Sequence, residues 1–491
     1  IPSTMSTTIK DNPFFPVIAA SALVLAAVPV YYSLRSKPKK PLQRQWSFTS
    51  EGMKLGVFPP KVKAPATIIN TAMYYEGEPP SVIALAEQVV TLLLEYDRFS
   101  KIPGDGGVLR DSAKAYQASD LIRTVEASKE DLHETIYSML EDPLDKGRED
   151  KPWWELVRIV NATKSVVLFR VHHCLGDGLS LVKAFENVLK TKDGTPAQEN
   201  KVTKALMNRP PPMPPLKSLL QSFFQVVTLA SSKFDDATAI YKKDITYSGK
   251  RSVLLFPDVP LQYIKNIKNE APFATTINDI LMCVMAQALH DYCLSQSDAV
   301  LRQKGPNLQC RALLPISLPR SQSLLQDKST ALQNAFCMVS ADFHMESSHP
   351  TVVSRLQAVH DTTTKLKQSP TAAVQLWMQN NIVSKLPVNV GRQTAHDIFS
   401  RHSLVVTNVP GPEHPGWVAG KEVVGLQLFF PNVIPQVDLL TYAGTVYGNI
   451  VYDPEDWKNG EIIAGLYAKA LVSLGKECGL EDRIPKSLVE A

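Results

Sequence analysis

Seven consecutive residues, His172-His173-Cys174-Leu175-Gly176-Asp177-Gly178, hold the side chains in this sequence that are best suited to chemistry. They follow an apolar run at 165–171, predicted to be a strand, and precede a predicted helix at 179–190. A histidine has a pKa near neutrality and can remove a proton from an alcohol at cellular pH. Adjacent strand residues point to opposite faces, so only one of the two imidazoles can face a given cleft. The pattern favours acyl transfer to a hydroxyl group.

Neighbouring residues refine this chemistry. Asp177 can cap the helix that follows, hold the loop through an ion pair with an arginine, or do both. Cys174 is predicted to be a small buried residue, since it has no activating charge beyond the neighbouring histidines. The sequence has no GxSxG segment, which disfavours a serine hydrolase. A direct transfer needs no enzyme nucleophile: the histidine takes the proton of the alcohol while its oxygen attacks a thioester.

The elements that must position these residues alternate between strands and helices. Period-2 and apolar runs predict strands at 154–160, 165–171, 252–256, 312–316, 336–343, 404–409, 425–430 and 445–452. Helical spacing of apolar residues predicts helices at 82–96, 131–140, 278–294, 352–367 and 462–474. This mixture indicates an α/β or α+β layered fold.

At 491 residues the chain is too long for one ordinary core, so two domains are expected. The proline-rich stretch RPPPMPP at 209–215 predicts a stiff, extended connector. We therefore divide the chain into a membrane anchor with a basic collar (1–40), a first domain (41–208), a crossover (209–250) and a second domain (251–491). The apolar helix predicted at 216–230 is either buried or rests on a membrane surface or an acyl-chain channel.

The uncharged segment 14–34 is long enough to cross a bilayer and is followed at once by basic residues. The positive-inside rule then places the catalytic body in the cytosol, as in a single-pass protein of the endoplasmic reticulum membrane. A signal peptide is the alternative. The sequon Asn161-Ala162-Thr163 is predicted to form an exposed hairpin turn that carries no glycan in this topology.

Charge and cysteine usage exclude several classes of protein. The formal net charge of +4 comes without a basic patch interleaved with aromatic residues, so no nucleic-acid partner is expected. The six cysteines are scattered, which indicates free thiols in a reducing compartment. Histidine and cysteine do not cluster at zinc-ligand spacing, so neither a metal nor a cofactor is expected.

Five segments, in order along the chain, resemble one family. The HHxxxDG pattern is typical of CoA-dependent acyltransferases. Residues 152–155 (PWWE) resemble "PLWE", 276–281 (TINDIL) resemble "TVNDVLL", and 311–317 (RALLPIS) resemble "RALVPVS". Residues 408–412 (NVPGP) are identical to a segment of that family. Together they make the chain similar to the wax ester synthase/diacylglycerol acyltransferase family.

This resemblance implies a fold of two chloramphenicol-acetyltransferase-like domains with a channel between them. It implies His173 as the general base, His172 as a supporting residue, and Asp177 as a structural residue pointing away from the channel. Substrates are then expected near Gly178, Asn278, Asp279 and Asn408. Asn278 could instead cap a helix, and Asn408 could merely form a turn. Arg311 is expected to be the ion-pair partner of Asp177.

The same resemblance implies acyl-CoA as co-substrate and a fatty alcohol or diacylglycerol as acceptor, beside the bilayer that holds them. Acceptor preference, acyl chain length and oligomeric state do not follow from the sequence. At 41–44 the chain keeps only the first two residues of the family's "PLSP" segment. The alternatives are a BAHD-like transferase of soluble alcohols, whose DFGWG segment is missing, a peptide-synthetase condensation domain, and a catalytically inactive lipid-binding protein.

Overall fold

The computed structural model describes residues 46–128, 131–148, 150–196, 215–317, 320 and 322–490. The predicted membrane segment at 14–34, the basic residues after it and the connector at 209–214 lie outside these residues. Within the described parts of the chain, no helix is both long and apolar enough to cross a bilayer.

The first sheet is built around the strand that leads to the paired histidines. Its order is β14-β1-β6-β5-β4, with β14 at Gly425–Phe429, β1 at Ile68–Glu76, β6 at Lys164–His172, β5 at Trp154–Val160 and β4 at Ile122–Glu126. The predicted hairpin of β5 and β6 is confirmed, and Trp154 pairs with Val171. Nearly every residue of β6 is buried, which explains its continuous apolar run.

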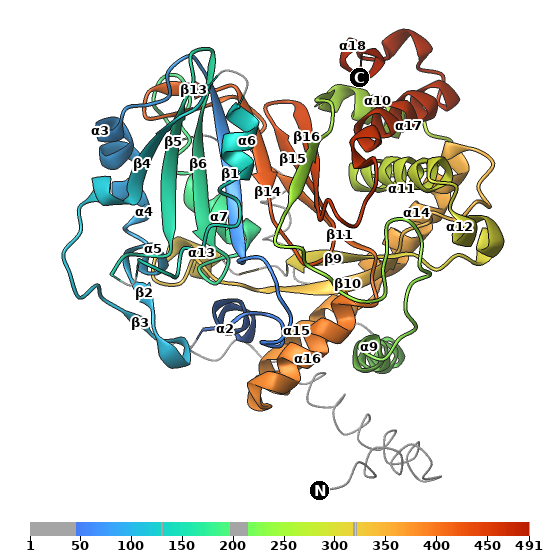
Figure 1. Cartoon of the computed structure of the whole chain (residues 1–491), viewed down its shortest axis with the longest axis horizontal. Helices are drawn as coiled ribbons and strands as arrows, with labels where there is room; N and C mark the ends of the chain where they lie inside the picture. Colours follow the sequence, from blue (N-terminus) through green and yellow to red (C-terminus); the bar gives the residue numbers. More distant parts are fainter. Residues whose placement is uncertain are drawn as a thin grey trace, which may run out of the picture.

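The second sheet belongs to the second half of the chain. Its order is β10-β9-β11-β15-β16-β7, with β10 at Phe336–Asp342, β9 at Arg311–Ser317, β11 at Leu404–Pro410, β15 at Gln436–Tyr442, β16 at Thr445–Tyr452 and β7 at Ser252–Leu255. The short strand β8 (Val259–Pro260) also pairs with β16. Helices α11 (Ile277–Ser295), α14 (Val352–Gln368) and α17 (Ile463–Glu477) pack beside this sheet and build the largest apolar core (Figure 1).

One strand of the first sheet is supplied by the second half of the chain. This strand, β14, pairs with β1. Figure 1 shows this orange strand beside the blue and green strands of the first half. The two halves are therefore joined by a shared sheet as well as by packing, which a division by chain position does not anticipate.

Four helices surround the space between the sheets: α2 (Phe48–Leu55), α9 (Leu216–Leu229), α15 (Thr371–Asn381) and α16 (Val388–Phe399). Helix α9 has two different faces. Leu219 and Phe223 pack against Val374 of α15, whereas Phe224 and Val227 are more than half exposed. One face of this helix is thus buried, as in the first of the two alternatives, and its other face is apolar and exposed.

The remaining elements are short. The helix predicted at 82–96 contains a π-helical turn at Ala86–Val90 between α3 (Val82–Leu85) and α4 (Thr91–Leu93). The others are α5 (Asp97–Ser100), α6 (Leu132–Tyr137), α7 (Gly178–Phe185), α10 (Leu261–Glu270), α12 (Ala299–Lys304), α13 (Gln322–Gln326), α18 (Lys486–Val489), and the two-stranded ribbons β2 (Ile102–Pro103) with β3 (Leu109–Arg110) and β12 (Gly416–Val418) with β13 (Lys421–Val423).

The sequon lies at the predicted hairpin, but its asparagine is buried. Asn161 is only 3% exposed, and its amide donates to the carbonyl of Ser128 over 2.7 Å. The turn is exposed at Ala162 and Thr163, as predicted, but the asparagine that would accept a glycan is not. Since a glycan on this amide would break the hairpin contacts, the absence of a glycan could not report on topology.

Candidate active site

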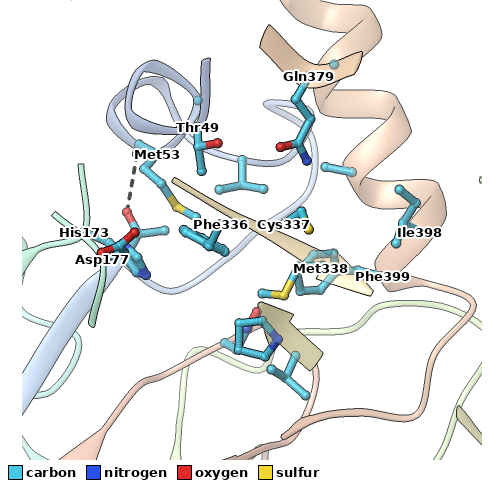
Figure 2. A pocket seen from close by; sticks show the side chains of 18 of the residues that line it. Thr49, Met53, His173, Asp177, Phe336, Cys337, Met338, Gln379, Ile398 and Phe399 are labelled. Carbon is cyan, nitrogen blue, oxygen red and sulfur yellow. Dashed lines mark hydrogen bonds between the residues drawn. The ribbon is translucent and has the colours of Figure 1, made fainter. Parts of the chain in front are cut away.

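A large cavity of about 1050 Å³ lies where residues of both sheets meet. The loop after β6 supplies His173, Asp177 and Gly178, and strand β10 supplies Phe336 and Met338. Figure 2 shows His173 and Asp177 together, with Phe336 beside them and Met338 and Phe399 farther along the cavity. The structure thus places the predicted base in a space that can admit substrate.

The ring of His173 is held in one tautomer by Asn334. Nδ1 of His173 lies 3.1 Å from Oδ1 of Asn334, while the amide Nδ2 of Asn334 donates to the carbonyls of His173 (2.6 Å) and Cys174 (3.2 Å). Because Nδ2 faces only acceptors here, Oδ1 is the atom that faces the ring, and Nδ1 must carry the hydrogen. This assignment leaves Nε2 unprotonated, as a general base requires.

Packing also sets the basicity of His173. Its ring lies 5.4 Å from the rings of both Phe336 and Phe430, centroid to centroid. Burial lowers the pKa of His173 below its usual value of 6.5, although hydrogen bonds and the charge of Asp177 oppose this shift. The imidazole is therefore neutral at cellular pH and ready to accept a proton.

His172 faces the other way, as the strand geometry predicts. Its ring packs against Trp153, and its Nδ1 accepts a hydrogen bond from the backbone N–H of Cys174 over 3.2 Å. Burial lowers the pKa of His172 to about 3, with a smaller contribution from His173. His172 is thus a neutral core residue that shapes the turn. Burial likewise raises the pKa of the Cys174 thiol well above its usual range, as expected for an unreactive cysteine.

Asp177 has both roles considered from the sequence. It is the N-cap of α7, because its Oδ1 accepts from the N–H of Ser180 over 3.0 Å. Its Oδ2 accepts from the N–H of Ala335 over 2.9 Å and forms a buried ion pair with Arg320. The carboxylate is fully engaged by the protein, which makes it a structural group at the cavity wall.

The arginine predicted for this ion pair was the wrong one. Arg311 pairs instead with Asp235, with 2.7 Å between Nε and Oδ1. Arg311 opens β9 and Arg320 follows the end of that strand. Six residue steps along a strand span about 20 Å, so the two arginines serve opposite ends of the sheet.

The other predicted substrate-binding residues divide into two groups. Gly178 and Asn408 line the cavity. Asn278 lies behind the wall, with its Oδ1 3.4 Å from Nδ2 of Asn408, and it is not a helix cap, since Thr276 caps α11. Asp279 does not reach the cavity. Its carboxylate accepts from the backbone N–H of Thr276 (2.9 Å) within the capping box, so the expectation that Asp279 binds substrate is wrong.

Two residues important to the site were missed from the sequence, Asn334 and Arg320. Both belong to the stretch between β9 and β10, which carries no regular pattern apart from a short helix. Ser47, Ser50 and Arg98 add further contacts to this stretch and to the histidine loop. An asparagine just before one predicted strand and an arginine just after another were the available signals, but their partners lie more than 140 residues away.

The rest of the cavity is suited to a chain of hydrocarbon. Its walls include the apolar side chains of Met53, Met338, Ile398 and Phe399 (Figure 2). Its volume of about 1050 Å³ lies just above the range of about 300–1,000 Å³ for small-molecule sites. A base at one end of a long apolar cavity suits the modification of a lipid.

Comparison with known proteins agrees with this geometry. A model of the wax ester synthase/diacylglycerol acyltransferase catalytic domain matches residues 124–279, and a model of the WS/DGAT C-terminal domain matches residues 332–474. The chain belongs to the wax ester synthase/diacylglycerol acyltransferase family, and it is an acyltransferase.

Two relatives and one solved structure show how similar this chain is to other members of the family. A probable diacylglycerol O-acyltransferase of Mycobacterium tuberculosis is 24% identical over 357 residues, covering 66% of this chain and 71% of the relative. Wax ester synthase/diacylglycerol acyltransferase 9 of Arabidopsis thaliana is 26% identical over 373 residues, covering 66% and 73%. The wax ester synthase/diacylglycerol acyltransferase of Marinobacter aquaeolei VT8 has the same fold, with a TM-score of 0.60 and 16% identity over 89% of this chain and 100% of that one. This match confirms the two-domain fold of mixed strands and helices that was expected from the sequence.

Proposed function

We propose that this protein transfers a long-chain acyl group from acyl-CoA to the hydroxyl of a fatty alcohol or diacylglycerol, with His173 as the general base. The observation that carries the proposal is the position of His173 on the cavity wall, with Nδ1 bound to Asn334, which leaves Nε2 without a hydrogen. The relatives are named for diacylglycerol acylation and wax ester synthesis, and both diacylglycerol and a fatty alcohol present a hydroxyl on an apolar body that suits this cavity.

In the proposed reaction, Nε2 of His173 removes the hydroxyl proton as the oxygen attacks the thioester carbonyl. The tetrahedral intermediate then collapses, the carbon–sulfur bond breaks, and the CoA thiolate takes the proton back from His173. The two substrates, acyl-CoA and the alcohol, give two products, the ester and free CoA. The proposed reaction therefore needs neither a cofactor nor an enzyme nucleophile. The unreactive thiol of Cys174 is consistent with this direct transfer.

We further propose that the mouth of the cavity faces a membrane. Val227 of α9 and Leu386 and Val388 at the start of α16 line the cavity and are also about half exposed. Leu216 and Phe224 extend this apolar surface along α9. Exposed apolar clusters of this kind mark interaction sites, and a lipid acceptor must enter from a bilayer. The endoplasmic reticulum remains the proposed membrane, on the sequence of segment 14–34.

The catalytic proposal is tested with membranes from a host that makes no neutral lipid. Labelled palmitoyl-CoA is supplied with either hexadecanol or diacylglycerol, and wax ester is separated from triacylglycerol. His173→Ala should lower ester formation by about 10²–10⁴-fold, the usual effect of losing a general base, while circular dichroism stays unchanged. Full activity in this folded variant would favour a different base, and no ester from wild-type protein would favour a lipid-binding role.

The membrane proposal is tested separately with diacylglycerol presented in phosphatidylcholine vesicles, because the proposed anchor at 14–34 would by itself bind every variant to a membrane. Phe224→Ser with Val227→Ser should raise the KM for this acceptor. Matched changes of exposed apolar residues that do not line the cavity, Ile83→Ser with Val489→Ser, should leave the KM unchanged. An equal KM in both double variants would contradict the assigned face.

A further inference from the structure

A second cluster of chemically capable side chains lies in the loop between β10 and α14. His344, Glu346 and His349 form an H-x-E-x₂-H segment, and each offers a ligand atom within 4.8 Å of the others. Oε1 of Glu346 lies 3.1 Å from Nδ1 of His344 and 2.8 Å from Nε2 of His349. None of the three lines the acyl cavity.

We propose that this cluster binds one divalent transition-metal ion of the zinc class. Two imidazole nitrogens and one carboxylate oxygen are ligands that Zn²⁺ prefers, and a water molecule completes four-coordination. Ligands on a tetrahedral ion with bonds of about 2.1 Å are about 3.4 Å apart. The measured separations therefore require only small movements of side chains in a single loop. Histidine and cysteine positions alone predict no zinc site here; the structure adds the carboxylate between the two histidines.

Contacts behind the ligands hold them in place. Nε2 of His344 lies 2.8 Å from the hydroxyl of Thr362 on α14, the kind of outer contact that fixes the tautomer and orientation of a metal-bound histidine. The loop backbone is fixed as well, since the carbonyl of Met345 lies 2.7 Å from Nδ1 of His290 and Arg355 donates to the carbonyl of His344.

The charge of the cluster also suits a cation. Glu346 supplies a carboxylate whose Oε1 faces a nitrogen of each histidine. When a metal binds, the proton on Nδ1 of His344 must leave, and Nε2–H can then donate to Thr362. The guanidinium of Arg355 is the nearby competing charge, and it is engaged by the carbonyl of His344 and by Oε1 of Gln287.

The expected role is structural. The loop connects β10, which lines the cavity through Phe336 and Met338, to α14, which packs in the core of the second half. A bound ion would tie the two ends of this loop and stabilise the folded state by mass action.

The test uses full-length protein from which any affinity tag has been cleaved and metal removed with EDTA. Titration with Zn²⁺ by calorimetry should give one ion per chain and raise the melting temperature, and Co²⁺ should produce the visible absorption of a tetrahedral site. Glu346→Gln and His349→Gln should each weaken Zn²⁺ binding by at least about tenfold. His414→Gln, a change at an exposed histidine elsewhere, is the matched control and should bind as wild type does.

Two results would overturn the proposal. One is wild-type protein that takes up no stoichiometric Zn²⁺ at micromolar concentration. The other is equal binding by wild type, Glu346→Gln and His349→Gln, which would place the metal elsewhere. The wild-type titration keeps the test decisive even if a variant fails to fold.

Discussion

Asn334→Ala tests whether the orientation of the catalytic base contributes to catalysis. A control of similar stability loss is needed beside it, because the change also destabilises the loop. The change removes the acceptor at Nδ1 of His173, so the ring is free to adopt the tautomer with hydrogen on Nε2. A neutral hydrogen bond contributes about 0.5–1.5 kcal/mol, which corresponds to roughly a 2- to 13-fold change in the population of the reactive tautomer. We expect kcat to fall by about tenfold with little change in KM, well short of the loss expected for His173→Ala.

The same change leaves the carbonyl of His173 without its donor, whereas the carbonyl of Cys174 still accepts from the guanidinium of Arg98. The free energy of unfolding should fall by roughly 1–3 kcal/mol, measured in urea. Asn161→Ala is the control, since it also removes a buried amide with backbone partners, but at the other end of β6 from the histidine loop. It should cost similar stability and leave kcat unchanged.

The pH profile adds a readout that lost stability does not move. The hydrogen bond that Nδ1–H of His173 donates to Oδ1 of Asn334 raises the pKa of His173, so its removal lowers that pKa. A base works when it is deprotonated. The acid limb of kcat should therefore lie below pH 6.5 in wild type and move to still lower pH in Asn334→Ala. Equal loss of kcat in Asn161→Ala, or an unmoved acid limb in Asn334→Ala, would refute this reasoning.

Three further predictions follow from the geometry. Arg320→Met leaves Asp177 buried without its counter-ion and should lower the free energy of unfolding by about 3–5 kcal/mol, measured in urea. Adding Asp177→Asn should restore part of this stability, whereas additive losses in the double variant would argue against the ion pair. His172 has a pKa of about 3 in the folded state and 6.5 in the unfolded state, so the unfolded state binds more protons between these values and the free energy of unfolding falls as pH falls. From pH 7 to pH 5 the loss is about 2 kcal/mol, and His172→Asn should remove it from the measured difference. Met338→Trp should narrow the apolar cavity and shift acyl-CoA preference to shorter chains, by roughly fourfold in kcat/KM per excluded methylene, measured across a chain-length series.

Strands with continuous apolar or β-branched runs could be predicted from the sequence. The bounds of β5 and β16 match those expected, and β6 and β9 differ by one residue at each end. Their side chains are buried by neighbouring strands, so local pattern and tertiary environment agree.

Two central strands, β1 and β15, could not be predicted in this way because buried polar residues interrupt their apolar pattern. Asn70 in β1 donates to the carbonyls of Ile68 and Leu140. Asp438 in β15 accepts from the N–H of Phe430 and from the amide of Gln436, and burial raises its pKa to about 8. These groups are tolerated only because distant segments supply hydrogen-bond partners, and no local pattern reports that.

The residues of the candidate site likewise fall into those that a local pattern predicts and those that depend on distant segments. The prediction that only one of the two histidines faces the cavity, and the cap at Asp177, follow from strand alternation and turn chemistry within one short segment. The choice of His173 as the base comes from the family resemblance. The choice between Arg311 and Arg320 does not follow from a local pattern, because it depends on which end of β9 meets the histidine loop. Asn334 was beyond reach for the same reason, since its partners are backbone carbonyls of the other half of the chain.

The stretch before β10 therefore does more than connect two strands. Asn334 sets the tautomer of His173, Arg320 and the N–H of Ala335 hold Asp177, and the carbonyl of Gln333 accepts from the N–H of Asp177 over 3.2 Å. All of these groups come from the second half, while the histidines come from the first. The basic nitrogen is thus oriented only when the halves have assembled, and β14 joins them through the first sheet. Because base and cavity are completed by the same contact, loosening that contact should reduce catalysis before it exposes the core.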